Sequence, residues 1–142
     1  MNKDMLARAR ENQTKWPGTE NVTFVEGNIT EIPLEGGIAD CIISNCVINL
    51  VPDSDKQKVF AEMFRLLKPG GRVAISDILA KKALSVELRQ SVALYVGCVA
   101  GASLREEYER WLKEVGFTGM YATYIPEYQL INDRNCHCGC RE

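Results

Sequence analysis

The residues of this chain best suited to chemistry are its six cysteines. Cys41 and Cys46 lie near the end of an apolar run, Cys98 lies among small residues, and three more crowd into residues 135–140. Thiolate is the softest ligand that a side chain offers, so convergent cysteines suit soft metals and metalloids. A buried thiol can instead act as a small apolar side chain, which is our interpretation of Cys41 and the alternative for Cys46 and Cys98.

The segment "NCHCGC" (135–140) places three thiols and the only histidine of the chain within five residues. Structural zinc sites usually draw pairs spaced C-x₂₋₄-C from two separate segments, and the Cys-x-Cys-x-Cys spacing here is tighter. We therefore expect a tail that captures a soft metalloid, and the alternative is a tail without a role. The candidate ligands in it are Cys136, Cys138 and Cys140.

The apolar pattern predicts alternating helices and strands around these cysteines. Helices are expected at residues 3–15, 53–68, 85–98 and 103–115, and strands at 21–25, 39–44, 72–78 and within 117–131. This alternation predicts an α/β fold with a mostly parallel sheet. The run at 39–44 is typical of a strand buried on both faces, and Cys46 follows its carboxyl end, where open α/β sheets bind ligands.

Helix starts and turns complete this outline. Asp53 and Ser85 are expected to cap their helices, and Ser103 with Glu106 matches a capping box. We expect one domain at residues 1–134, followed by an irregular, cysteine-rich tail at 135–142.

The composition is that of a globular protein, with 142 residues, of which 46% are hydrophobic and 25% charged. A net charge of -2 provides no basic field for a phosphate backbone, so a nucleic-acid partner is not expected. No apolar run approaches the roughly 20 residues of a membrane helix, and no apolar signal core follows Met1. We therefore expect a cytoplasmic protein without a membrane partner, whose cysteines are reduced.

Three segments resemble one family of enzymes. The segment "RLLKPGGRVAISD" (65–77) resembles the helix–turn–strand of S-adenosylmethionine-dependent methyltransferases with a Rossmann-like fold. The segments "SNCVINLVPD" (44–53) and "VGCVAGA" (96–102) narrow the resemblance to the arsenite methyltransferase family. The opening "MNKDMLARAR" resembles the stretch just after the second strand of that sheet, and the resemblance continues to about residue 117.

The resemblance implies an incomplete Rossmann-like methyltransferase fold. In the family a first strand and a glycine-rich loop precede everything found here, and that loop lets backbone N–H groups approach the cofactor. We therefore expect an N-terminally truncated domain with a mostly parallel sheet that lacks its first strands. Such a sheet has exposed edges, which self-association into a homo-oligomer could cover.

The resemblance also implies the residues of a site. Cys46 and Cys98 would hold trivalent arsenic as thiolates, and the arsenic lone pair would attack the methyl carbon of S-adenosylmethionine. The protein would then contribute mainly alignment and exclusion of water. The cofactor contacts implied are Met1, Asn28, Ile29 and Asn45. For Asn28 and Asn45, the alternative is an ordinary turn residue.

The predicted function is methyl transfer from S-adenosylmethionine to thiol-bound trivalent arsenic, as part of arsenic detoxification. Its expected partners are arsenite and thiols such as glutathione. The first alternative is a fragment that binds arsenite or another soft metal through thiolates, without a cofactor and without catalysis. A further alternative is a degenerate Rossmann-like domain used only for association.

Overall fold

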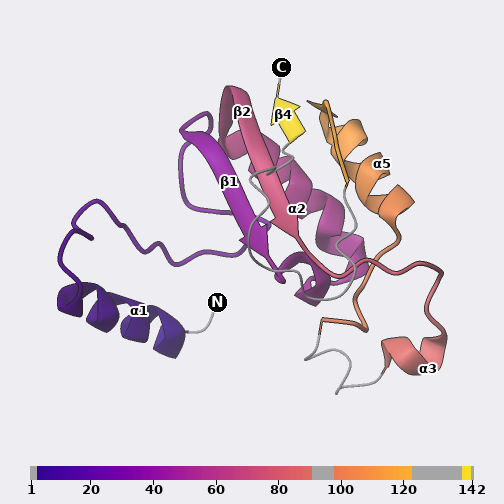
Figure 1. Cartoon of the computed structure of the whole chain (residues 1–142), viewed down its shortest axis with the longest axis horizontal. Helices are drawn as coiled ribbons and strands as arrows, with labels where there is room; N and C mark the ends of the chain where they lie inside the picture. Colours follow the sequence, from indigo (N-terminus) through magenta and orange to yellow (C-terminus); the bar gives the residue numbers. More distant parts are fainter. Residues whose placement is uncertain (1–2, 91–97, 123–138, 142) are drawn as a thin grey trace, which may run out of the picture. The chain divides into compact units, whose positions relative to one another are not determined.

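The computed structural model describes residues 3–90, 98–122 and 139–141 of the chain. The chain forms two compact units, Met1–Leu34 and Glu35–Glu142 (Figure 1). None of the helices in these described ranges is long and apolar enough to cross a membrane.

The first unit contains helix α1, Lys3–Lys15, at the predicted position. The strand predicted at 21–25 is wrong, because this stretch pairs with no other strand in the described part of the chain. The carboxamide of Gln13 instead donates to the carbonyl oxygens of Thr19 and Val22, both at 2.7 Å. β-rich composition alone does not make a strand when no neighbouring strand satisfies its backbone.

The second unit is built on a four-stranded sheet of order β1-β2-β4-β3. Strands β1, Ala39–Asn45, and β2, Leu67–Ser76, are parallel, as predicted, and register Asn45 with Ser76 at their carboxyl ends. Two short strands, β3 (Phe117–Thr118) and β4 (Gly139–Arg141), complete the sheet with antiparallel pairing.

Strand β2 differs from the predicted strand at 72–78. It begins at Leu67, because Leu67 already pairs with Ala39. The Pro69-Gly70-Gly71 segment lies inside the strand, at a register irregularity, where Gly70 takes the left-handed φ of +77° that glycine adopts without strain. The predicted irregular tail is also wrong at Gly139–Arg141, because β4 pairs with both β2 and β3.

Helix α2, Asp53–Leu66, connects the two parallel strands, and its buried apolar residues are Val59, Phe60, Met63 and Leu66. The predicted cap at Asp53 is wrong. Pro52 occupies the cap position, and the Asp53 carboxylate pairs instead with Lys56 and Arg89. A short 3₁₀ helix, η1 (Ile48–Leu50), lies between β1 and α2.

The later helices begin near their predicted starts. Helix α3, Val86–Arg89, is capped by the Ser85 hydroxyl, and the rest of the predicted helix lies partly outside the described residues. Helix α5, Arg105–Val115, is capped at Leu104, one residue after the predicted cap at Ser103. Glu107 accepts a hydrogen bond from the Leu104 N–H at 2.8 Å, while the Ser103 hydroxyl binds Lys56 instead.

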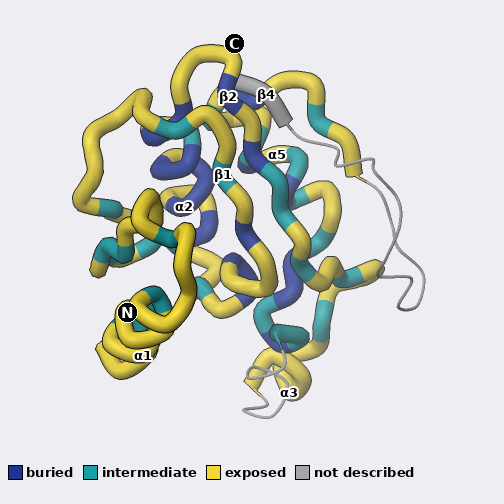
Figure 2. The backbone as a smooth tube through the Cα atoms, turned by 60° about the vertical axis from the view of Figure 1, so that its left-hand side comes forward, coloured by how far each residue is buried: buried dark blue, intermediate teal, exposed yellow. Residues whose placement is uncertain are grey.

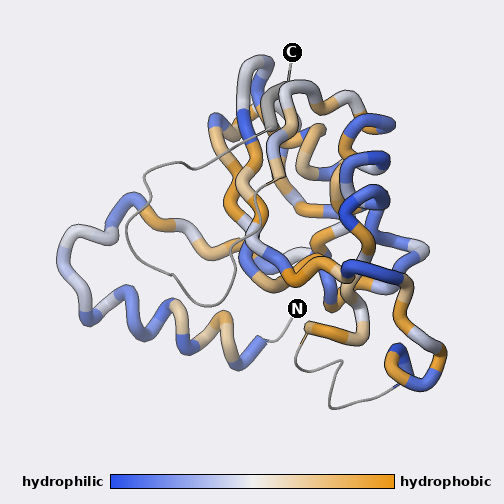
Figure 3. The backbone as a smooth tube through the Cα atoms, turned by 45° about the vertical axis from the view of Figure 1, so that its right-hand side comes forward, coloured by the Kyte–Doolittle hydropathy of each residue, from blue (hydrophilic) through white to orange (hydrophobic). Residues whose placement is uncertain are grey.

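The core of the second unit lies where α2 and α5 pack together beside the sheet (Figure 1). Phe60 contacts the rings of Tyr108 and Trp111, with centroids 5.3 and 6.0 Å away, and Phe64 meets Phe117 at 5.2 Å. Figure 2 shows the buried residues gathered on α2 and β2. Figure 3 shows apolar residues on the strands, whereas α1 is mainly hydrophilic.

Strand β1 is not buried on both faces, contrary to the prediction. Its even-numbered side chains become more buried toward its end, where Ser44 is buried, but Cys41, Ile43 and Asn45 on the other face are exposed. Ile43 is 80% exposed. This face of β1 is therefore open at these side chains. The interpretation of Cys41 as a core thiol is therefore wrong.

Candidate functional site

The site begins at the carboxyl ends of β1 and β2. Cys46 follows β1 directly, and its backbone N–H donates to the Ser76 carbonyl at 2.9 Å. Its φ of +53° lies in the left-handed region, which is uncommon for residues other than glycine. This conformation turns the chain out of the sheet just after the backbone hydrogen bond of Cys46 to β2.

Cys98 meets Cys46 from a distant part of the sequence. The Cys98 thiol donates to the Cys46 carbonyl oxygen at 3.5 Å, although 52 positions separate the two residues. Cys98 also has a left-handed backbone, with a φ of +60°. Strained backbone in residues other than glycine is concentrated at functional sites. The structure thus brings together the two cysteines that the sequence singled out.

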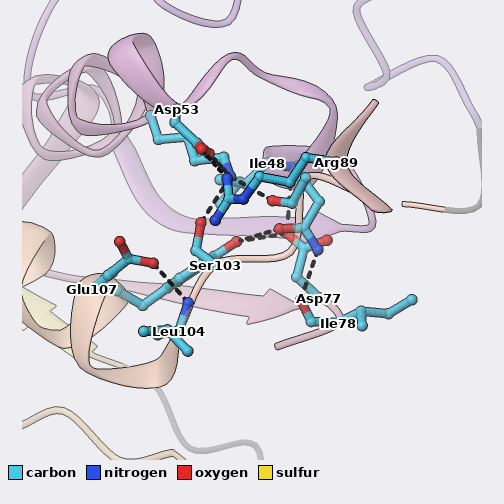
Figure 4. A network of polar contacts seen from close by, with 12 residues as sticks. Ile48, Asp53, Asp77, Ile78, Arg89, Ser103, Leu104 and Glu107 are labelled. Carbon is cyan, nitrogen blue, oxygen red and sulfur yellow. Dashed lines mark hydrogen bonds and ion pairs between the residues drawn. The ribbon is translucent and has the colours of Figure 1, made fainter. Parts of the chain in front are cut away.

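A polar network around Asp77 lies at the ends of the two parallel strands (Figure 4). Asp77, just after β2, accepts hydrogen bonds through Oδ2 from the Ile48 N–H at 3.3 Å and from the Tyr108 hydroxyl at 3.4 Å. The same hydroxyl lies 3.3 Å from Oδ1 of Asn49, a buried residue that donates through Nδ2 to the Ile78 carbonyl at 2.7 Å. The network joins the ends of both strands to α5.

Burial controls the charge of this network. It raises the pKa of Asp77, against the hydrogen bonds from Ile48 and Tyr108, which lower it. Oδ1 of Asp77 is buried and has no hydrogen-bond partner. The pKa of the Cys98 thiol is raised by desolvation, then by Cys46 and by Asp77. Both thiols are free of disulfides, and the raised pKa of Cys98 keeps this thiol protonated to a higher pH than an ordinary thiol.

A second cluster surrounds Lys56, which is fully buried on the first turns of α2 (Figure 4). Its ammonium donates to Asp53 Oδ1 at 2.6 Å, to the Gly101 carbonyl and to the Ser103 hydroxyl at 2.8 Å. An ammonium has three N–H donors, and all three are used here. The other carboxylate oxygen of Asp53 pairs with Arg89.

The predicted cofactor contacts are only partly described. Asn45 is exposed at the end of β1, in the position expected for a ligand contact. In the first unit, the Asn28 side chain accepts from the Thr30 N–H at 3.2 Å, which is an Asx-type turn and matches the alternative interpretation of Asn28. Ile29 is half-buried in the same turn.

Several of the predicted site residues lie outside the described part of the chain. Met1, Cys136 and Cys138 lie outside the described residues, and Cys140 is described only as part of the β4 backbone. Within the described ranges, no group of three or more His, Cys, Asp or Glu side chains could hold a metal ion. The thiol pair of Cys46 and Cys98 is therefore the candidate ligand set among the described residues.

Sequence reasoning missed Lys56, Asn49 and Tyr108. Lys56 resembles an ordinary surface lysine of an amphipathic helix, and its only sequence signal is Asp53 three residues earlier. Asn49 stands next to an apolar pair without any polar pattern. Tyr108 falls on the predicted apolar stripe of α5, which locates its ring in the core but not its hydroxyl in the polar network.

The fold and a match to a protein-family model define the class of the protein. The chain belongs to the methyltransferase domain family, whose model matches residues 1–116. It has in part the Rossmann-like fold of S-adenosylmethionine-dependent methyltransferases, as predicted. The structure of an arsenic(III) S-adenosylmethionine methyltransferase from Chlamydomonas reinhardtii superimposes with a TM-score of 0.64 and 34% identity, over 80% of this chain and 39% of that chain.

Two arsenite methyltransferases are similar in sequence to this chain. The arsenite methyltransferase of Halobacterium salinarum is 41% identical over 117 residues, which are 82% of this chain and 29% of the relative. The arsenite methyltransferase of Aquipseudomonas alcaligenes is 44% identical over 104 residues, which are 71% of this chain and 30% of the relative. The chain thus spans less than a third of the length of these two relatives.

Proposed function

We propose that this chain binds trivalent arsenic through Cys46 and Cys98 and contributes to its methylation by S-adenosylmethionine. The observation that carries the proposal is the contact between the two thiol-bearing turns at the carboxyl end of the parallel strands, where the Cys98 thiol lies 3.5 Å from the Cys46 carbonyl oxygen. Open α/β sheets bind ligands at this end. The likeness to arsenite methyltransferases over the same residues supports arsenite as the substrate.

The thiol pair suits arsenite in a balanced exchange. Each cysteine forms an As–S bond, one hydroxyl ligand leaves arsenic, and the thiol proton goes with it as water. Soft thiolate ligands favour this trivalent centre. Two As–S bonds leave the arsenic lone pair free, and the surrounding protein aligns that lone pair for attack and limits the access of water.

Residues near the strand end suit a bound cofactor. The side chain of Asn45 is exposed beyond β1, and its carboxamide can both donate and accept hydrogen bonds. When bound, S-adenosylmethionine would supply an electrophilic methyl carbon. We propose Asn45 as a contact in the second unit, with Met1, Asn28 and Ile29 as further contacts by resemblance.

Several finer proposals accompany this function. The tail residues Cys136, Cys138 and Cys140 would capture arsenite and pass it to the Cys46–Cys98 pair. The protein would act in the cytoplasm, in arsenic detoxification, with glutathione as a thiol partner. The edge position of β1 and the 80% exposure of Ile43 support self-association through that edge.

Calorimetric titration of the chain with arsenite, and separately with S-adenosylmethionine, tests the proposal. A Cys136→Ser/Cys138→Ser/Cys140→Ser chain removes the tail thiols and isolates the pair. In that background Cys46→Ser and Cys98→Ser should each abolish tight arsenite binding, whereas the exposed Cys41→Ser should leave it unchanged. Arsenite binding without cofactor binding would restrict the chain to capture. Equal arsenite binding by the Cys98→Ser variant would refute the thiol pair.

A further inference from the structure

We propose that Lys56 is a positioning residue, which fixes the segment that carries Cys98 against the turn that carries Cys46. This inference rests on the proposed function, because it assigns Lys56 a part in presenting both thiols to one arsenic centre. It stands on three contacts of the buried Lys56 ammonium, of which the one with Ser103 is itself buried, and on the close approach of two backbone segments.

The first anchor lies after Cys98. Lys56 donates to the carbonyl oxygen of Gly101 and to the hydroxyl of Ser103, at 2.8 Å for the latter. Both acceptors lie within five residues of Cys98, and Ser103 is 2% exposed. The turn that carries Cys98 is therefore tied to helix α2.

The second anchor lies before Cys98. Asp53 binds Lys56 through Oδ1 and Arg89 through Oδ2, and Arg89 ends α3. Arg89 and Ser103 thus attach the chain on both sides of Cys98 to the first turns of α2.

The segment after Cys98 also closely approaches the segment after Cys46. Asn49 lies three residues after Cys46, and the Asn49 carbonyl oxygen would be 1.9 Å from a Cβ on Gly101. The backbone at Gly101 therefore passes directly over the backbone at Asn49, at a distance that only glycine allows. Lys56 holds the Gly101 carbonyl in this contact, so its ammonium sets how closely the two cysteine-bearing turns approach.

The Lys56 side chain has no contact with solvent. Its side chain is 0% exposed, and a buried ammonium without acceptors is costly. Helix α2 contains a matched pair, since Lys58 contacts Asp55 at the same 2.6 Å and the same spacing of three residues, but with a side chain 67% exposed. Lys58 touches no cysteine-bearing segment in the described contacts. Replacing Lys58 therefore measures the effect of losing a lysine and its ion pair from α2 without any contact to the cysteine-bearing segments.

The test uses the full chain with Cys41, Cys136, Cys138 and Cys140 replaced by Ser, so that Cys46 and Cys98 are the remaining thiols. Lys56→Met keeps the length and apolar body of the side chain but removes the ammonium, and Lys58→Met is the control. Arsenite affinity is measured by calorimetry. The alkylation rate of each thiol by iodoacetamide is measured by mass spectrometry, and a short bifunctional thiol reagent measures cross-linking between the two.

We expect Lys56→Met to raise the Kd for arsenite at least about tenfold, because a second ligand on the same centre contributes about 10² to 10⁴ when geometry allows both to engage. The cross-linking rate should fall similarly. Single-thiol alkylation should change less than about twofold, because it needs no second thiol and reports access alone. Lys58→Met should leave all three measurements unchanged. If the role of Lys56 were purely structural, Lys56→Met would change the alkylation rate of each thiol as much as it changes cross-linking and arsenite affinity.

Unchanged arsenite affinity and cross-linking in a folded Lys56→Met chain would overturn the inference. If circular dichroism shows that this variant does not fold, Ser103→Ala removes one of the three acceptors, and an unchanged cross-linking rate there has the same meaning. If the parent chain cross-links efficiently but does not bind arsenite, the proposed function fails. Cross-linking that still depends on Lys56 would in that case support the positioning role alone.

Discussion

Gly101→Ala provides the sharpest test of the contact between the two cysteine-bearing turns. The added Cβ would lie 1.9 Å from the Asn49 carbonyl oxygen, where ordinary contact begins at 3.4 Å. The two backbones would therefore have to separate by about 1.5 Å, because the obstacle is a carbonyl group rather than the end of a flexible side chain. Backbone torsion adds no comparable penalty, since Gly101 does not have a left-handed φ.

The structural change predicts two magnitudes. Overpacking costs about 1–3 kcal/mol of unfolding free energy, and the backbone contact places Gly101→Ala toward the upper end. Moving the two thiols apart removes part of the gain from a second ligand on one centre, which is about 10² to 10⁴, so we expect the Kd for arsenite to rise about 10- to 100-fold. Urea denaturation measures the first quantity, and arsenite calorimetry measures the second.

Gly70→Ala is the matched control. Gly70 has a φ of +77° and nothing within 4 Å of an added Cβ, so its replacement costs about 1–2 kcal/mol of backbone strain without moving either turn. We expect Gly70→Ala to lose stability and keep arsenite affinity. Wild-type stability and wild-type affinity in Gly101→Ala would refute the close approach of the two turns.

Three further predictions follow from the site and the sheet. Burial raises the pKa of Asp77 in the native state above its usual value of 3.8, so the native state holds this proton more tightly than the unfolded state. The contribution of Asp77 to stability is therefore largest below this usual value and falls as pH rises through the native pKa. Asp77→Asn keeps an acceptor for the Ile48 N–H and should therefore become more stable than wild type in urea denaturation as pH rises above the usual aspartate value of 3.8, with about equal stability below it. A stability difference that does not change with pH would contradict the assignment. Tyr108→Phe removes the hydroxyl from Asn49 and Asp77 and should lower the unfolding free energy by about 1 kcal/mol, with no loss expected if the hydroxyl contacts were incidental. Ile43→Lys places a charge on the edge strand and should shift any concentration-dependent oligomer toward monomer in sedimentation, with folding stability changed by less than about 0.5 kcal/mol.

The elements with strong periodicity could be predicted from the sequence. The helix at 3–15 follows from its strong helix formers, and the parallel strands and the helix that connects them follow from apolar runs and helical apolar spacing; each is present. The strand expected at 21–25 is absent because strand formation depends on a partner, and composition does not reveal one. The burial of β1 was overestimated for the same reason, since an apolar run does not show whether both faces of its sheet are covered.

The two candidate ligands could be predicted from the sequence, whereas the residues that position them could not. Cys46 could be placed at a strand end by pattern, and resemblance paired it with Cys98, whose thiol contacts the Cys46 carbonyl oxygen. Lys56 could not be found, because its burial depends on acceptors at Gly101 and Ser103, far away in the sequence. The shifted capping box has the same cause: Lys56 takes the Ser103 hydroxyl that the local pattern assigned to α5. Side chains that act over long distances in sequence leave little local signal.

The left-handed backbone at Cys46 and Cys98 has an evolutionary consequence. At φ values of +53° and +60°, glycine is the residue that the fold itself prefers, and a side chain there costs about 1–2 kcal/mol. Replacing Cys46 or Cys98 by glycine would therefore raise the free energy of unfolding of this chain. A lineage that no longer used the thiols would gain by losing them, so the retention of cysteine at both positions in a descendant chain would itself indicate continued selection for thiol chemistry.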